Sequence, residues 1–206
     1  MTEYTVKTYI ADAASLDISA REVARYLGYS REAIVSESDP EIVKTIEEVR
    51  PLIAGKACYC RYPLSFFDTD GVELPYGPVR SADLRRNLEG CSGIYVFAAT
   101  IGAGFDRALK RVSLRSMAEA AYWQAAGAAA IEAVCDALNK MLEEEAAEQG
   151  LHLRRRFSPG YGDLGLENQK GVFQILNPSK LIGLSLMDSL IMSPEKSVTA
   201  LIGIGE

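Results

Sequence analysis

The residues best suited to bind a ligand lie between Arg154 and Asp163, where positive charge, glycines and a tyrosine occur together. A guanidinium such as that of Arg156 presents a planar pair of donors that matches a carboxylate with two parallel hydrogen bonds. Gly160 and Gly162 allow backbone N–H and C=O groups to approach a ligand where a Cβ would collide. The segment therefore predicts a site for a small anion, although an edge strand ending in a turn, with its arginines solvated, fits the same residues.

Other residues with reactive side chains lack the partners that their chemistry needs. His152 is the single histidine, and no nucleophile elbow is present for a Ser-His-Asp or Cys-His mechanism. Gly102 and Gly104 have the spacing of a dinucleotide-binding turn, but the third glycine position holds Arg107. The four cysteines lack the paired C-x-x-C spacing of structural zinc sites, so we predict buried thiols. We expect neither a metal site nor a catalytic side chain.

Length and charge restrict the class of protein. The chain has 206 residues, of which 48% are apolar, 22 are basic and 28 are acidic. We expect one domain over residues 1–206, with 1–90 as its N-terminal portion and 91–206 as the core that carries the site. The acidic excess disfavours nucleic acid, whose affinity depends on clustered Lys and Arg. No bilayer-spanning segment or secretory signal is recognisable, which predicts a cytoplasmic protein that binds no membrane.

Two strong patterns predict the elements that position the Arg154–Asp163 segment. The continuous apolar run Ile94–Thr100 predicts a central strand buried on both faces. From Ser116 to about Gln149 only Gly127 disfavours a helix, which predicts one long Ala-rich helix with Glu132 on its polar face. The class is therefore mixed α/β.

The remaining elements follow from alternation and from capping residues. Alternation over Leu151–Phe157 predicts a strand, with Arg155 on its apolar face and Arg156 on the opposite face. Strands are also predicted at Tyr4–Ile10 and Cys58–Tyr62, and two more over Leu184–Ile204, joined near Ser193-Pro194-Glu195-Lys196. Helices are predicted from Ser19 to Leu27, from Ser38-Asp39-Pro40 to about Ala54, over Phe105–Val112 and Gln169–Leu176, and from Pro178. A turn or hairpin loop is predicted at Asp68–Pro78 and an irregular loop at Ser158–Asp163.

Several short motifs occur in the order and spacing of one known family. They are Arg156-Phe157-Ser158-Pro159-Gly160-Tyr161-Gly162-Asp163, Phe173-Gln174-Ile175-Leu176, Ile182-Gly183-Leu184-Ser185-Leu186, Asp188-Ser189 and Met192-Ser193-Pro194-Glu195-Lys196-Ser197-Val198. Together they resemble the activation domain of cobalamin-dependent methionine synthase, and more closely its free-standing activation-protein form. The resemblance covers residues 150–203 and the segment 96–135, whereas residues 1–90 match only loosely.

The resemblance implies a fold, a ligand and a set of site residues. The fold is a largely antiparallel twisted sheet flanked by helices. In that family the domain binds S-adenosylmethionine and presents its methyl group to cob(II)alamin, while flavodoxin supplies an electron. The family's R-x-x-x-G-Y motif falls on Arg156, Gly160 and Tyr161, so Arg156 is expected to hold the ligand's carboxylate. The cofactor-binding residues that the resemblance implies are Arg156, Ser158, Pro159, Gly160, Tyr161 and Glu132.

The resemblance also implies partners. The chain has no recognisable segment for homocysteine, folate or cobalamin, so we expect it to act in trans on a cobalamin-dependent methionine synthase that lacks its own activation domain. Cobalamin would be bound by that partner, and a flavodoxin-like protein would donate the electron. The chain ends at Glu206, so no ligand contacts are expected from the C-terminal extension of the fused domain. Two alternatives stay open: a non-catalytic adaptor that docks on a corrinoid protein without using S-adenosylmethionine, and an activator of another corrinoid methyltransferase.

Overall fold

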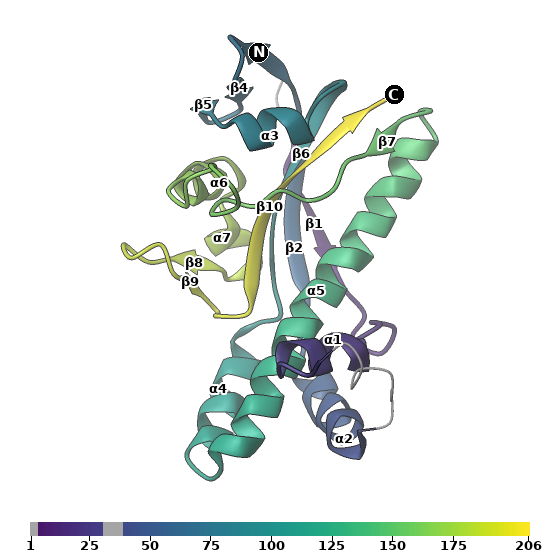
Figure 1. Ribbon diagram of the computed structural model, residues 1–206, viewed down its shortest axis with the longest axis vertical. Coiled ribbons are helices and arrows are strands. Elements are labelled where there is room, and N and C mark those ends of the chain that lie inside the picture. Colours follow the sequence, from purple (N-terminus) through teal and green to yellow (C-terminus); the bar gives the residue numbers. More distant parts are fainter. Residues whose placement is uncertain (1–3, 31–38) are drawn as a thin grey trace.

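A five-stranded antiparallel sheet forms the centre of the computed structural model, which describes residues 4–30 and 39–206 (Figure 1). In spatial order its strands are β1 (Lys7–Ile10), β2 (Lys56–Pro63), β6 (Cys91–Thr100), β10 (Ser197–Gly205) and β7 (His152–Leu153). Nine of the ten residues of β6 are buried. This confirms the central strand predicted from the apolar run in the sequence.

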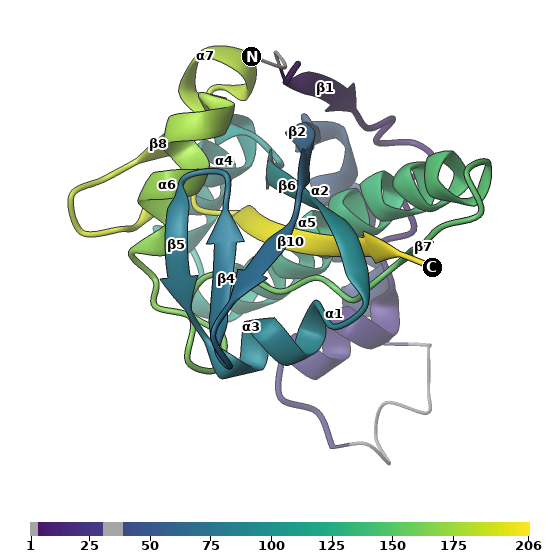
Figure 2. The same ribbon diagram turned by 90° about the horizontal axis from the view of Figure 1, so that it is seen from above.

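Helices cover both faces of this sheet. One face carries α1 (Ala20–Tyr26), α2 (Pro40–Val49), α4 (Ala103–Ser113) and α5 (Met117–Ala147), and the other carries α3 (Ala82–Asn87), α6 (Asn168–Leu176) and α7 (Pro178–Ile182). Figure 2 shows α6 and α7 on the opposite side of the strands from the C-terminal half of α5. Because successive side chains of a strand point to opposite faces, β6 contributes side chains to both cores, with Tyr95 and Phe97 in one and Ile94 and Val96 in the other.

The short elements differ most from the sequence prediction. Where a turn or hairpin loop was predicted over Asp68–Pro78, the chain forms a small antiparallel sheet of β3 (Ser65–Phe67), β4 (Gly71–Leu74) and β5 (Gly77–Arg80). The predicted strand pair near the C-terminus is instead three strands, because a hairpin of β8 (Ser185–Leu186) and β9 (Met192–Ser193) precedes β10. Strands of two to four residues are too short for alternation to be recognised.

The starts of α1 and α2 agree with the capping residues. Ser19 accepts a hydrogen bond from the backbone N–H of Glu22 at the start of α1, as predicted, but the Glu22 carboxylate pairs with Arg25 instead of returning to the cap. Asp39 caps α2, while Ser38 lies outside the described residues. The chain from 50 to 52 continues from α2 as a short 3-10 helix, η2 (Arg50–Leu52), so the predicted end at Ala54 was slightly too late.

The long helix α5 extends from the end that carries α1, α2 and α4 toward β7 (Figure 1). Its 31 residues correspond to about 46 Å at about 1.5 Å per residue. Ser116 caps its start by accepting from the N–H of Glu119. Gly127 is required by a neighbour, because a Cβ there would lie 2.3 Å from Cζ of the fully buried Phe105. A residue of low helix propensity at this position therefore lets α4 pack closely against α5.

The strand predicted over Leu151–Phe157 is largely wrong. Of this segment, only the two residues of β7 pair regularly with β10. The next contacts are the N–H of Arg154 donating to the carbonyl of Gly203 at 2.8 Å and an isolated bridge from Phe157 to Leu201. Arg155, predicted on an apolar face, is exposed. Three consecutive arginines cannot alternate into a core without burying a charge, so the segment follows β10 irregularly.

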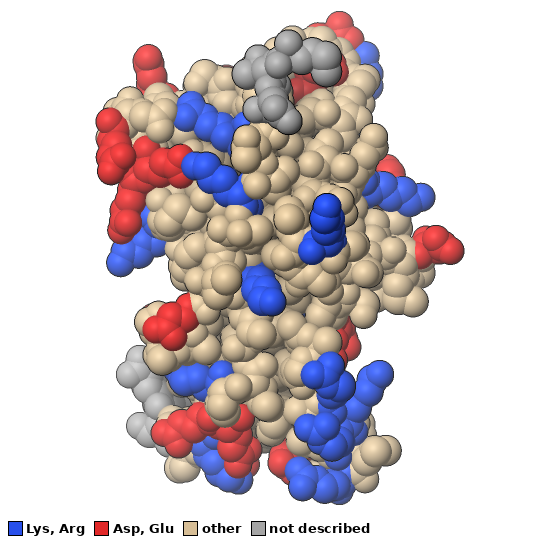
Figure 3. Space-filling model, turned by 180° about the vertical axis from the view of Figure 1, so that it is seen from behind, with Lys and Arg blue, Asp and Glu red and all other residues tan. Residues whose placement is uncertain are grey.

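Charged side chains of both signs share the back of the molecule (Figure 3). Basic side chains gather at the end formed by α4, which contributes Arg107, Lys110 and Arg111. Within residues 4–30 and 39–206, no helix is both long and apolar enough to cross a membrane. The expectations that the chain binds neither nucleic acid nor a membrane stay predictions.

The contact between Gly127 and Phe105 can be tested by adding a methyl group. Gly→Ala in a helix interior normally stabilises by about 1 kcal/mol. We expect Gly127→Ala to destabilise instead, by about 1–3 kcal/mol, because the new Cβ overlaps a buried ring. Thermal unfolding measures the effect. The same change in a Phe105→Leu background should cost much less, and a Gly127→Ala variant that melts above the wild type would contradict this account of α5.

Candidate functional site

A pocket of about 950 Å³ lies beside the first half of β10. Its walls come from five other parts of the chain: α5 (Glu132, Asp136, Asn139), α3 (Asp83, Arg86, Asn87), the start of α6 (Gln169), Met192 of β9 and the segment from Arg155 to Gly162. This volume is at the upper end of the range for small-molecule sites, about 300–1,000 Å³. Five of the six residues predicted to bind the ligand line the pocket, namely Arg156, Ser158, Pro159, Tyr161 and Glu132.

Gly160, the sixth predicted site residue, shapes the loop rather than lining the pocket. Its N–H donates to the carbonyl of Leu164 at 2.8 Å, and Tyr161 and Leu164 donate to the carbonyls of Ser158 and Tyr161 at 3.0 Å each. Gly160 and Gly162 have φ values of +94° and +52°, which side chains disfavour. A Cβ on Gly162 would also lie 2.4 Å from Oδ2 of Asp83. The predicted irregular loop is thus a pair of tight turns that hold Tyr161 at the pocket.

Asp163 attaches this loop to the start of α3, which forms an adjoining wall of the pocket. Its carboxylate accepts hydrogen bonds from the Ser81 hydroxyl, from the N–H of Ala82 at 2.7 Å and from the N–H of Asp83 at 3.3 Å. These donors lie at the start of α3, whose residues Asp83 and Asn87 face the pocket. The hydroxyl of Ser81, followed by the two backbone N–H groups, lowers the pKa of the Asp163 carboxyl. One carboxylate therefore fixes the distance between two pocket walls.

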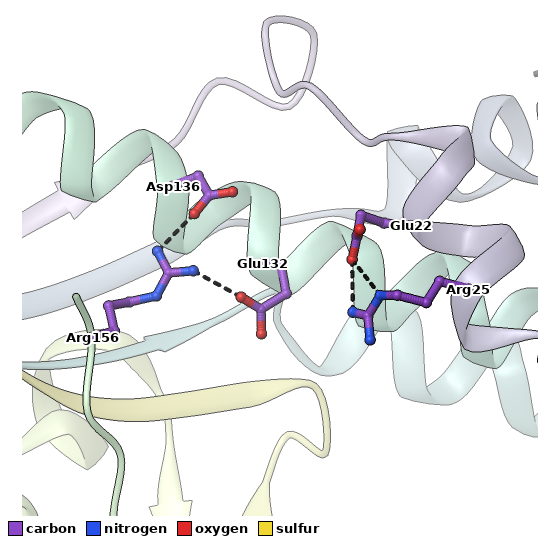
Figure 4. Close-up of polar contacts among 5 residues, drawn as sticks. All are labelled: Glu22, Arg25, Glu132, Asp136 and Arg156. Carbon is purple, nitrogen blue, oxygen red and sulfur yellow. Dashed lines mark hydrogen bonds and ion pairs between the residues drawn. The ribbon is translucent and has the colours of Figure 1, made fainter. Parts of the chain in front are cut away.

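The Arg156 side chain lies between two carboxylates of α5 (Figure 4). Its Nη2 is 2.9 Å from Oε2 of Glu132, and its Nη1 is 2.7 Å from Oδ1 of Asp136. Only 22% of the Arg156 side chain is exposed. Residues four apart on a helix lie on the same face, which lets one guanidinium reach both acids. The structure thus brings together Arg156 and Glu132, and it adds Asp136, for which the i, i+4 spacing was the available signal.

The charge of this cluster suits a ligand with both an anionic and a cationic group. Partial burial, the largest influence, lowers the pKa of Arg156, but the hydrogen bond that Arg156 donates to Asp136 and the neighbouring negative charges outweigh it and raise that pKa overall. The guanidinium therefore stays charged. It has five N–H donors, and two of them bond to Glu132 and Asp136 within the described ranges. The others can bind a carboxylate, while the two acids offset a nearby cation.

The cysteines are free and buried, as predicted. Burial raises the pKa of the Cys58 thiol to about 12, and burial likewise raises the pKa of Cys135. Reactive thiols require a lowered pKa and exposure. Neither cysteine lines the pocket, which is built from charged and hydrogen-bonding side chains with Phe157, Pro159 and Met192 as its apolar part.

Among solved structures, the chain is similar to a crystal structure of the MetH reactivation domain bound to AdoHcy. The TM-score is 0.69 at 14% sequence identity, and the match covers 98% of this chain and 79% of that one. No family model and no curated protein matches the sequence. The chain therefore has the fold of the reactivation domain, with its twisted antiparallel sheet flanked by helices and its one long helix, which confirms the predicted fold class.

The attachment by Asp163 predicts a pH dependence of stability. Because the folded-state pKa of Asp163 is lowered, its hydrogen bonds stabilise the fold above the unfolded-state pKa of about 3.9 and are lost as the pH falls further. We expect Asp163→Asn to lower the melting temperature at pH 7, and the difference from wild type to shrink as the pH approaches about 3. The exposed Asp188 offers a control, and Asp188→Asn should change little. A gap for Asp163→Asn that is equal at pH 7 and pH 3 would contradict the assignment.

Proposed function

We propose that this chain is a reactivation component of cobalamin-dependent methionine synthase. It binds S-adenosylmethionine in the pocket and presents the methyl group to cob(II)alamin on a separate synthase polypeptide. The observation that carries the proposal is the arginine of the R-x-x-x-G-Y motif, Arg156, held by Glu132 and Asp136 at a pocket of ligand size. The fold supports it, because the similar reactivation domain was crystallised with AdoHcy.

The ligand's amino acid end matches the charges around Arg156. Its carboxylate takes the unused donors of the guanidinium, and its ammonium and sulfonium groups lie near the carboxylates of Glu132 and Asp136. The segment from Ser158 to Tyr161 forms the adjoining wall. Charge-assisted hydrogen bonds of this kind contribute about 1.5–3 kcal/mol each, so the cluster can fix the orientation of the ligand.

The reaction asks for positioning rather than for acid–base catalysis. Cobalamin, bound by the partner, would supply the reduced cobalt that takes up the methyl group, and a flavodoxin-like donor would supply the electron that cob(II)alamin needs. The carbon–sulfur bond breaks, sulfur keeps its electron pair, and S-adenosylhomocysteine leaves. Holding sulfur, carbon and cobalt in line can lower the barrier by about 7–11 kcal/mol. A pocket built for binding is sufficient for this role, with residues 1–206 acting as one domain.

Removal of the Arg156 guanidinium should weaken ligand binding. We expect Arg156→Ala to raise the dissociation constants of S-adenosylmethionine and S-adenosylhomocysteine about 10- to 100-fold, the equivalent of one charged hydrogen-bond pair. Arg156→Lys keeps the charge without the planar pair of donors, so its dissociation constants should lie between those of wild type and Arg156→Ala. Isothermal titration calorimetry measures all three proteins.

Arg154 provides the matched control. It belongs to the same basic run, but it donates to the carbonyl of Glu89 and lies outside the pocket lining. Arg154→Ala should bind the ligand as the wild type does. Equal dissociation constants for Arg156→Ala and wild type would refute the carboxylate contact.

Action in trans can be measured directly. Cob(II)alamin-loaded synthase lacking its own activation domain is mixed with this chain, S-adenosylmethionine and a reduced flavodoxin, and methylcobalamin is followed by absorbance. We expect methylcobalamin to form only when all four components are present. Recovery of the synthase without S-adenosylmethionine would select the adaptor alternative, and no recovery with the full set would refute the proposed function.

A further inference from the structure

The pocket contains a second group of side chains that the Arg156 cluster does not use. Four buried polar atoms of its lining have no hydrogen-bond partner among the described residues: Oδ1 of Asn87, Oδ1 of Asn139, Oε1 of Gln169 and Oγ1 of Thr199. The most deeply buried of these residues are Gln169 and Thr199, which are 6% and 2% exposed. Native proteins leave few buried polar groups unpaired, because each one is destabilising. Their concentration at one pocket points to a ligand.

Gln169 and Thr199 lie on the other side of β10 from the Arg156 cluster. Val198 and Ala200 belong to the core that includes α5, whereas Leu201 belongs to the core that includes α6. Strand alternation therefore places the Thr199 side chain on the α6 side. Gln169 shares the buried face of α6 with Val172 and Leu176. The pocket thus extends around the edge of β10, with the Arg156 cluster toward α5 and Gln169 and Thr199 toward α6, where Asp83 and Arg86 of α3 also line it.

Backbone groups add a donor and an acceptor beside the Gln169 and Thr199 side chains. Leu201 exchanges two backbone hydrogen bonds of 2.9 Å with Phe157, so its N–H and C=O point away from β6. Thr199 lies two residues earlier and has the same orientation. Within the described ranges, no residue pairs with Thr199 on that edge as Phe157 does with Leu201. The backbone of Thr199 therefore offers a donor and an acceptor to the pocket.

We propose that Gln169 and Thr199 form a separate subsite for a neutral purine nucleoside, the end of the ligand remote from its amino acid group. The proposal rests on the proposed function and deepens it. An amide, a hydroxyl and a strand edge supply donors and acceptors without charge, which suits the edge of a heterocycle or ribose hydroxyls rather than a phosphate. Phe157 and Met192 supply apolar lining for a ring, and Tyr161 keeps 66% of its surface exposed beside them.

Variants of similar volume distinguish a ligand-binding role of these two side chains from a structural one. Thr199→Val and Gln169→Leu remove the polar atoms and keep the volume. We expect each to bind S-adenosylhomocysteine about tenfold more weakly, while the melting temperature of the free protein stays the same or rises. Thr45 is the control, because it is 1% exposed but donates to the carbonyl of Glu41 at 2.7 Å. Thr45→Val should show the opposite pattern, with a lower melting temperature and unchanged affinity.

Two fragments of the ligand locate the effect. Adenosine should bind wild type and Arg156→Ala equally and lose affinity in Thr199→Val and Gln169→Leu. Methionine should depend on Arg156 and be indifferent to the two isosteric variants. If wild type and both isosteric variants bind adenosine and S-adenosylhomocysteine equally, the subsite is refuted while the proposed function stands. If adenosine loses affinity only in the two isosteric variants, but S-adenosylhomocysteine binds wild type no more tightly than adenosine does, the subsite is supported and the carboxylate contact is refuted. Binding of neither adenosine nor S-adenosylhomocysteine to wild type would refute both.

Discussion

The attachment of Arg156 to two carboxylates of α5 is the interaction on which the arrangement of the pocket depends. Ion pairs that remain partly exposed contribute about 1 kcal/mol or less to stability, and the Asp136 side chain is 70% exposed. Their consequence is positional. They hold an irregular segment, which has few regular strand contacts of its own, against the long helix α5, which extends along the sheet. Asp163 does the same at the other end of the segment by binding the start of α3.

The hydrophobic cores make this arrangement rigid. Because α5 and one face of β6 share a core, the sheet cannot move relative to α5 without disturbing that core, and the core on the other face holds α6 and α7 in the same way. The close approach of Phe105 to Gly127 fixes α4 against the same helix. The two acids that hold Arg156 lie between that contact and the C-terminal end of α5. A ligand in the pocket therefore meets preformed walls rather than a mobile loop alone.

The sequence predicted the elements whose signals are local. The apolar run of β6, the alanine-rich α5 and the cap at Ser19 depend on neighbouring residues only, and they were correct. The segment around Arg156 was not, because its alternation was typical of a strand while its charges prevented burial. Gln169 and Thr199 gave no signal, since a polar residue in an amphipathic element looks the same whether water or another element covers it. Tertiary contacts alone distinguish those cases.

In the proposed function, the two-sided pocket would hold a sulfonium ligand for methyl transfer without the need for a catalytic side chain. A sulfonium ligand is already activated, so the protein needs to fix both ends of the molecule and leave the methyl group between them free to approach the acceptor. The edge of β10 separates the Arg156 cluster near α5 from Gln169 and Thr199 near α6. A ligand bound at both would cross that edge with its sulfur at the middle. Because neither end alone determines the direction of the carbon–sulfur bond, the separation of the two proposed subsites would orient the reaction.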